Sequence, residues 1–286
     1  MRIDAHLHFW KPACGFDNKP VADNAAYRRD FLPVDVRPAL DAAGIDAAIL
    51  VQTAPQVAET DWLLALADDL PWIAGVTGWV DLDAATGIDV AALRAKPKLV
   101  GMRAQLRRVA DAAFILRPNV LRSLAAILDA GLSVTMLAES RHYAHVADAL
   151  ERLPPGPVTL NHLGMRFADA DPSAWRDAMR RFARRDSLQL QLSGLPFLFG
   201  TPWRGADAQQ VLDDALDIFG AQRLMFASDW PMLVRYATYA EWAAAVADFL
   251  AARGASADDV AAVFGGNALR ANPAIASPPR PRPPAG

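Results

Sequence analysis

The chain has 286 residues, of which 53% are hydrophobic, and 29 Lys and Arg residues nearly balance 32 Asp and Glu residues. This length suits a single barrel domain of about 250 residues, and the near balance of charge without a basic block gives no support for binding to nucleic acid or an anionic membrane. Cys14 is the only cysteine, which excludes an internal disulfide framework and a thiolate metal cluster. We therefore expect a cytoplasmic protein with a small-molecule partner and no nucleic-acid or membrane partner; a homo-oligomer stays open.

Short apolar runs rich in β-branched residues alternate along the chain with longer segments of helical period. Eight runs are expected to be strands: 3–8, 47–52, 73–80, 99–105, 132–137, 158–162, 188–193 and 224–228. Helical period is clearest at 62–70, 121–130, 174–184 and 211–219, and Gly44 has the position of a left-handed helix stop. Eight such units predict a (β/α)8 barrel, and an open doubly wound sheet is less well supported because no early strand leads into a Gly-rich turn.

Two segments lie outside this alternation. Residues 11–33 form a polar connection after the first strand that is too long for an ordinary loop, so it is either a lid over the barrel mouth or a surface excursion. The barrel is expected over residues 1–272. Residues 273–286 are Pro-rich, and we expect an extended or disordered tail there.

Polar residues stand where the predicted strands end, which is the edge at which barrels of this kind carry their chemistry. Alternation in the first strand predicts that Asp4, His6 and His8 point to one face. The list of strand-end residues continues with Gln52, Trp79, Asp81, Arg103, Gln105, Asn161, His162, Ser193 and Asp229. Asp229 precedes Trp230 and Pro231, so the strand stops there and leaves the carboxylate at the rim. Taken singly, each histidine could be a satisfied polar residue and Asp229 a helix cap, but together they predict a convergent active site.

Four motifs resemble the amidohydrolase superfamily, and more narrowly its lactonase-like branch. They are 3–10 (IDAHLHFW), 78–81 (GWVD), 101–106 (GMRAQL) and 224–231 (LMFASDWP), supported by segments 162–164 (HLG) and 192–194 (LSG). The resemblance covers residues 2 to about 270. It implies a (β/α)8 barrel that opens the ring of a small lactone, with a sugar-acid lactone favoured over a doubly anionic pyrone because Arg103 is the only cation placed at a strand end. A metal-dependent decarboxylase, hydrolysis of an amide or phosphoester, and a non-enzymatic binding barrel are the alternatives.

The resemblance also implies roles for the strand-end residues. Asp229 is the expected general base, assisted by His6, His8 and His162, while Arg103, Gln105, Gln52, Trp79 and Trp230 are expected to bind substrate. One divalent metal such as zinc could be held by His6, His8 and Asp229, with His162 and with Glu139 or His142 as further candidates, although the lactonase-like branch includes enzymes that work without metal. A two-metal site is not expected, because the middle strands lack the bridging ligand.

Overall fold

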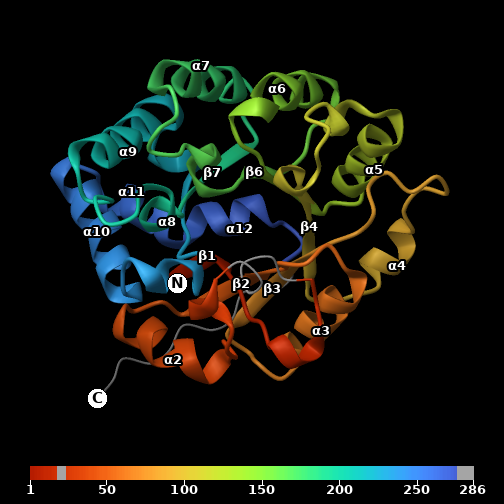
Figure 1. Ribbon diagram of the computed structural model, residues 1–286, viewed down its shortest axis with the longest axis horizontal. Helices are drawn as coiled ribbons and strands as arrows, with labels where there is room; N and C mark the ends of the chain where they lie inside the picture. Colours follow the sequence, from red (N-terminus) through yellow and green to blue (C-terminus); the bar gives the residue numbers. More distant parts are fainter. Residues whose placement is uncertain (18–23, 276–286) are drawn as a thin grey trace.

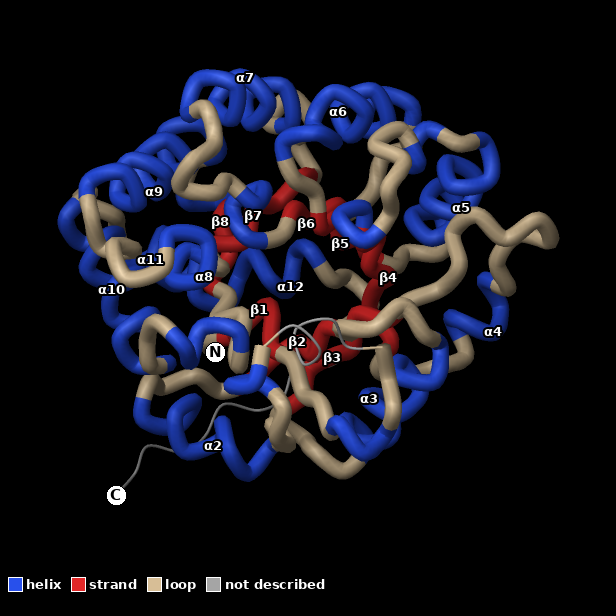
Figure 2. Tube along the Cα trace, viewed as in Figure 1, coloured by secondary structure: helices blue, strands red, loops and turns tan. Residues whose placement is uncertain are grey.

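The architecture is a ring of eight parallel strands inside a ring of helices (Figures 1 and 2), seen in a computed structural model that describes residues 1–17 and 24–275. The strands pair in sequence order and are β1 (Ile3–Leu7), β2 (Ala47–Val51), β3 (Ile73–Gly78), β4 (Leu99–Gln105), β5 (Ser133–Leu137), β6 (Val158–Leu160), β7 (Leu188–Leu192) and β8 (Leu224–Phe226). The predicted (β/α)8 barrel is confirmed. All eight expected runs contain a strand.

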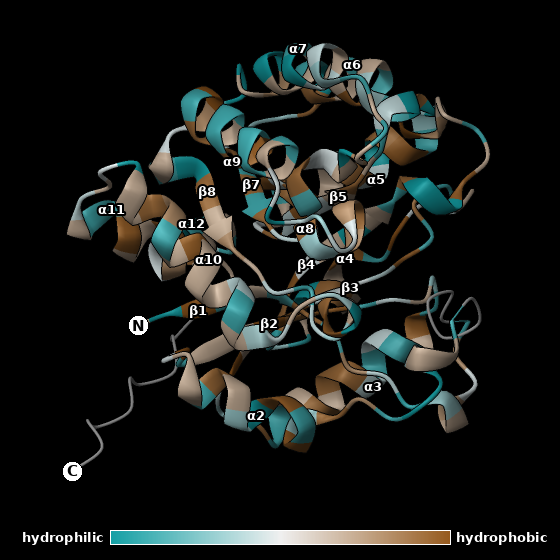
Figure 3. Cartoon of the chain, turned by 60° about the vertical axis from the view of Figure 1, so that its left-hand side comes forward, coloured by the Kyte–Doolittle hydropathy of each residue, from teal (hydrophilic) through white to brown (hydrophobic). Residues whose placement is uncertain are grey.

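Helices follow the strands, and most of them surround the barrel (Figure 1). They are α2 (Pro33–Ala42), α3 (Val57–Asp68), α4 (Val90–Arg94), α5 (Pro118–Asp129), α6 (Tyr143–Arg152), α7 (Pro172–Phe182), α8 (Leu195–Phe199), α9 (Ala206–Phe219), α10 (Tyr239–Ala252), α11 (Ala257–Ala261) and α12 (Asn267–Ala271). Gly44, just after α2, has φ 65°, as expected of a left-handed stop. Figure 3 shows both hydrophilic and hydrophobic residues on these helices, the pattern of elements with one buried face.

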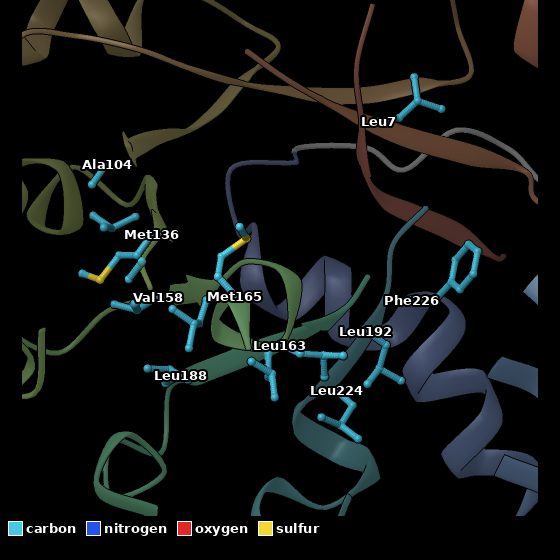
Figure 4. Packing of buried hydrophobic residues seen from close by; sticks show 14 of the residues in the cluster. Leu7, Ala104, Met136, Val158, Leu163, Met165, Leu188, Leu192, Leu224 and Phe226 are labelled. Carbon is cyan, nitrogen blue, oxygen red and sulfur yellow. The ribbon is translucent and has the colours of Figure 1, made fainter. Parts of the chain in front are cut away.

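The buried apolar side chains form two separate clusters. The larger one fills the layer between strands and helices, and Figure 4 shows part of it, including Leu188, Leu192, Leu224 and Phe226 on neighbouring strands. The smaller cluster joins inward-facing strand residues, such as Ile3, to Ala268 and Ala271 of α12. In Figures 1 and 2, α12 lies across the middle of the strand ring, so this short helix plugs the barrel at the end opposite the strand-end residues.

The barrel closes between β1 and β8 without a regular ladder. An isolated parallel bridge joins Leu7 to Trp230, and the amide of Asp229 donates to the carbonyl of His6 at 2.9 Å. The pairing of β1 with β2 also shifts register between Asp4 and Leu7. The shift changes the direction of the side chains, so the prediction that Asp4 shares a face with His6 and His8 is wrong: Asp4 accepts a hydrogen bond from Tyr239 of α10.

The two segments set apart by sequence are only partly described. In the first, 3-10 turns form at Pro12–Cys14 and Ala25–Tyr27, and Trp10 pairs with Phe31, while residues 18–23 lie outside the described residues. Most of the expected tail, 276–286, also lies outside them. Among the residues that the structure describes, no helix has both the length and the apolar composition that crossing a membrane requires.

Candidate active site

Three histidines and one aspartate converge at the carboxyl ends of β1, β6 and β8. Oδ1 of Asp229 lies 3.2 Å from Nε2 of His8, 3.7 Å from Nε2 of His162 and 3.8 Å from Nε2 of His6. The Nε2 atoms of His6 and His8 are 3.1 Å apart. All four side chains are buried. The structure therefore brings together the four residues that the sequence singled out from strands far apart in the chain.

Two of these side chains, those of His162 and Asp229, extend from residues whose backbone is in the left-handed region. The residues from His162 to Met165 all have φ between 50° and 68°, and Asp229 has φ 56°. Such conformations are rare outside glycine and concentrate at functional sites. Gly194, after β7, leaves room for this turn, because a Cβ added there would lie 2.8 Å from Cβ of His162. Local sequence did not predict this turn.

Hydrogen bonds behind the rings fix which histidine nitrogen faces the site. Nδ1 of His8 lies 2.6 Å from the carbonyl of Val51, and Nδ1 of His6 lies 2.9 Å from Oε1 of Gln191. Gln191 is oriented by donating from Nε2 to the carbonyl of Ala5. Because these oxygens can only accept, both histidines donate from Nδ1 and carry a lone pair on Nε2. Nδ1 of His162 is held by Oγ of Ser193 at 2.8 Å.

Burial and charge set the protonation states at the site. The pKa of His162 is lowered to about 4, chiefly by burial; Asp229 opposes this shift, while Arg103 and His8 add to it. Burial also lowers the pKa of His6 well below its usual value, with further lowering by His162 and His8. Burial alone would raise the pKa of Asp229, but His162, His8 and Arg103 outweigh it, so this pKa is lowered. At neutral pH the site therefore holds an ionised carboxylate beside the neutral imidazoles of His6 and His162.

This arrangement fits a divalent cation that accepts nitrogen and oxygen ligands. Two Nε2 lone pairs face each other, and Oδ1 of Asp229 accepts no hydrogen bond from the described residues although it is buried. Ligand atoms of His6, His162 and Asp229 all lie within 4.8 Å of one another. Neutral imidazole and carboxylate are ligands that zinc accepts. His8 is not in that group but lies 3.1 Å from His6 and 3.2 Å from Asp229, so its role as a ligand stays a prediction.

A cavity of about 490 Å³ opens over these residues. It is lined by side chains from most of the strand-end loops: His8, Asn24, Tyr27, Thr53, Arg103, Gln105, Arg107, Arg108, Leu137, Glu139, His162, Met165, Gly194, Phe197, Asp229, Met232, Arg235 and Tyr236. The volume lies in the range of about 300–1,000 Å³ that is common for small-molecule sites. His6 lies behind this surface, so it can act on a bound molecule only through its neighbours or a shared cation.

Arg103 presents a buried cation to the cavity. Its guanidinium donates to Oδ1 of Asn161 at 3.1 Å and to the carbonyl of Gln52 at 2.9 Å. Burial lowers its pKa to about 10, with Asp229 and Glu59 acting against that shift, so it stays charged at neutral pH. No carboxylate of the described residues forms a salt bridge with it, so its charge is left for a bound molecule.

The expected substrate-binding residues divide into two groups. Arg103 and Gln105 line the cavity, whereas Gln52 lies beneath it and accepts a hydrogen bond from Nε2 of Gln105 at 3.1 Å. Trp230 packs edge-on against Phe9 and Phe31 and does not line the cavity. Trp79 lines a separate, neighbouring cavity instead.

The two further metal candidates stand apart from the histidine cluster. Glu139 lines the cavity but is paired with Arg107 at 3.2 Å and with Arg141 at 2.8 Å. His142 accepts a hydrogen bond from the amide of Glu139, as part of a capping turn. Neither belongs to the group of converging ligand atoms.

Several lining residues had no sequence signal. Asn24 and Tyr27 come from the long connection after β1, and the hydroxyl of Tyr27 donates to the carbonyl of Met232 at 2.7 Å. This contact ties the described end of that connection to the loop after β8, where Arg235 and Tyr236 also reach the cavity. Loop residues of mixed type carry no periodicity, so only the fold reveals that they meet.

Comparison with known proteins gives the family. The amidohydrolase family model matches residues 3–271. An L-fucono-1,5-lactonase of Burkholderia multivorans is 35% identical over 284 residues, covering 94% of this chain and 95% of that protein, and one of Burkholderia ambifaria is 32% identical over 272 residues, covering 93% of each.

A solved structure agrees with these relatives. The crystal structure of an amidohydrolase of Burkholderia multivorans with bound zinc superposes with a TM-score of 0.85 at 34% identity, covering 95% of this chain and 98% of that one. The range matched by the family model, residues 3–271, contains all eight strands of the barrel. The chain belongs to the amidohydrolase family.

Proposed function

We propose that the protein hydrolyses the ring ester of a small sugar-acid lactone. The observation that carries this proposal is the ionised, buried Asp229 beside the neutral imidazoles of His6 and His162 at a cavity of about 490 Å³. The family and the two lactonase relatives support the same reaction. A lactone needs an activated water for attack, a stabiliser for the carbonyl oxygen, and a proton for the departing alkoxide.

Asp229 supplies the base. Its Oδ1 has no hydrogen-bond donor of its own among the described residues, so it is free to accept a proton from a water molecule. Attack of that water on the carbonyl carbon leaves the proton on the carboxylate. The collapse of the tetrahedral species then breaks the ring C–O bond, and the same proton passes to the alkoxide oxygen. The product is an open-chain hydroxy acid.

Arg103 and the histidines supply the electrostatic stabilisation of the carbonyl oxygen. The charged guanidinium of Arg103 faces the cavity and can bond the oxygen on which negative charge develops. His6, His162 and Asp229 would hold a zinc ion, with His8 beside them. When bound, such an ion supplies Lewis-acid polarisation of the carbonyl and lowers the pKa of water. Gln105, at the cavity wall, is placed to bond sugar hydroxyls.

Proton release from a panel of five- and six-membered aldonolactones, including L-fucono-1,5-lactone, tests this proposal. Turnover well above the spontaneous rate for one stereochemical family supports it and identifies the sugar configuration. The proposal is contradicted if the folded protein releases no protons above the spontaneous rate from any lactone of the panel, with or without added zinc. Release of carbon dioxide from an aromatic or unsaturated acid by the same preparation would support the decarboxylase alternative.

A further inference from the structure

A second cavity lies beside the one described above. It has a volume of about 360 Å³ and is lined by residues that follow β3 and β4 together with parts of two neighbouring loops. Three side chains, those of Arg103, Gln105 and Arg108, line both cavities. The two cavities are therefore direct neighbours that share a wall formed by these side chains.

The second cavity offers flat apolar faces next to charged hydrogen-bonding groups. Trp79 and Phe114 are both partly exposed there, and the carboxylates of Asp17 and Asp81 lie at its border. Aromatic faces pack against the C–H surfaces of a sugar ring, while carboxylates and guanidinium groups bond its hydroxyls. This combination of aromatic faces and hydrogen-bonding groups suits a carbohydrate ring better than a purely apolar group.

Gln105 carries an unused acceptor at the junction of the two cavities. Its Nε2 donates to Oε1 of Gln52 at 3.1 Å and to the carbonyl of Thr53 at 3.0 Å, which fixes the orientation of the amide. Its Oε1 is buried and accepts no hydrogen bond from the described residues, and the residue is only 8% exposed. A buried acceptor without a partner is costly, so it points to a donor supplied by a bound molecule.

The walls of the second cavity are held in place before any ligand arrives. Arg108 donates to Oδ2 of Asp17 at 2.7 Å and to the main-chain carbonyl of Asp17 at 3.0 Å. The amide of Trp79 donates to Oγ1 of Thr60 at 2.9 Å, at the start of the segment that carries the indole. A preformed wall reduces the ordering cost of binding.

We propose that the second cavity binds a sugar ring that the substrate carries as a substituent, so that the protein accepts glycosylated aldonolactones, that is, lactones of disaccharide acids. The lactone ring occupies the cavity over Asp229, the glycosidic bond passes beside Gln105, and the second ring lies against Trp79 and Phe114. The inference rests on the proposed lactone hydrolysis. It adds a substrate class with two sugar rings.

Calorimetric binding of stable hydroxy-acid products tests the subsite without requiring turnover. We compare gluconate with lactobionate and melibionate, which carry a second ring at different positions of the same acid. The expected result is that one of these disaccharide acids binds about tenfold more tightly than gluconate. Equal binding of all three acids would overturn the proposal.

Two variants locate the effect. Phe114→Ala removes an aromatic face and Val80→Trp fills the cavity, and each should abolish the advantage of the disaccharide acid while gluconate binding stays within twofold. Trp72→Ala is the matched control, because this partly buried indole precedes β3 and lies at the opposite end of that strand. An advantage that survives in both cavity variants would place the second ring elsewhere and contradict the proposal.

Turnover separates this inference from the function on which it rests. If monosaccharide lactones are hydrolysed and lactobiono-1,5-lactone gains nothing over glucono-1,5-lactone, the subsite is wrong and the lactonase stands. If the disaccharide acids bind selectively and no lactone is hydrolysed, the second cavity is a sugar site and the proposed reaction is wrong.

Discussion

Asp229 is the residue on which the proposed chemistry depends most directly. It is buried, its pKa is lowered, and its backbone lies in the left-handed region with φ 56°. Asn is among the few residues that adopt this backbone region readily, so Asp229→Asn removes the base without forcing the chain to move. The substitution isolates the chemical role of the carboxylate from its role in folding.

We expect Asp229→Asn to reduce kcat for the best lactone by about 10²- to 10⁴-fold, the usual contribution of a general base. Steady-state proton release measures the rate, and thermal unfolding checks that the fold is retained. Asp169→Asn, at an exposed carboxylate outside the cavity, is the control and should keep full activity. Retention of more than a tenth of the activity by Asp229→Asn would remove Asp229 from the role of base.

At the residue scale, the sequence predicts which polar residues stand at the strand ends better than it predicts where their side chains point. His6, His8, His162 and Asp229 were found because strand ends of a barrel converge whatever the details of each loop. Trp230 was misplaced because an indole next to a strand end can turn into the packing layer as easily as into the cavity, and nothing in its neighbours' sequence decides which. The catalytic roles of the three histidines and Asp229 stay predictions.

At the element scale, the most consequential local feature is how β1 joins β8. Oδ1 of Asp4 accepts the amides of His6 at 3.1 Å and Ser228 at 2.9 Å, and Oδ2 accepts the hydroxyl of Tyr239 at 3.0 Å. This single buried carboxyl therefore replaces part of the missing ladder between the two strands that carry His6 and Asp229. Sequence alternation could not reveal it, because the register shift in β1 breaks the period of two on which the prediction relied.

Asp4→Ala should lower the free energy of unfolding by about 3 kcal/mol, because it leaves two buried amides and a hydroxyl without an acceptor. Asp4→Asn keeps an acceptor of the same shape and should cost clearly less, while Tyr239→Phe should cost about 1 kcal/mol. Denaturant unfolding measures the three variants against the unchanged chain. If Asp4→Ala were no less stable than Asp4→Asn, the hydrogen bonds of this carboxyl would not be what closes the barrel.

Element boundaries also show that the sequence pattern does not reveal local irregularities of the backbone. The expected run 99–105 matches β4 (Leu99–Gln105) in full, and all seven of its residues are buried. The run 158–162 becomes the shorter β6 (Val158–Leu160), because the left-handed turn at His162 replaces the end of the strand. Propensity gives no warning of such a turn in residues other than glycine.

At the scale of the whole molecule, binding at the histidine cluster is coupled to folding. The ligands come from β1, from the turn after β6 and from the end of β8, so a cation held there binds the folded chain and not the unfolded one. Any such ligand stabilises the folded state by mass action, by about 2.7 kcal/mol when its free concentration is 100 times Kd. For a domain of this size that corresponds to about 5–10 °C in Tm.

Zinc added to metal-free protein should therefore raise Tm by several degrees, and His162→Ala should lose most of this gain while His145→Ala, at a histidine outside the cluster, keeps it. Differential scanning calorimetry measures the shift, and elemental analysis of the protein after dialysis gives the number of ions retained. Facing Nε2 lone pairs on His6 and His8 favour uptake of a cation, since without one these nitrogens repel or must share a proton. An unchanged Tm with no retained zinc, together with lactone turnover that resists chelators, would show that the imidazoles and Asp229 work as a metal-free acid–base cluster.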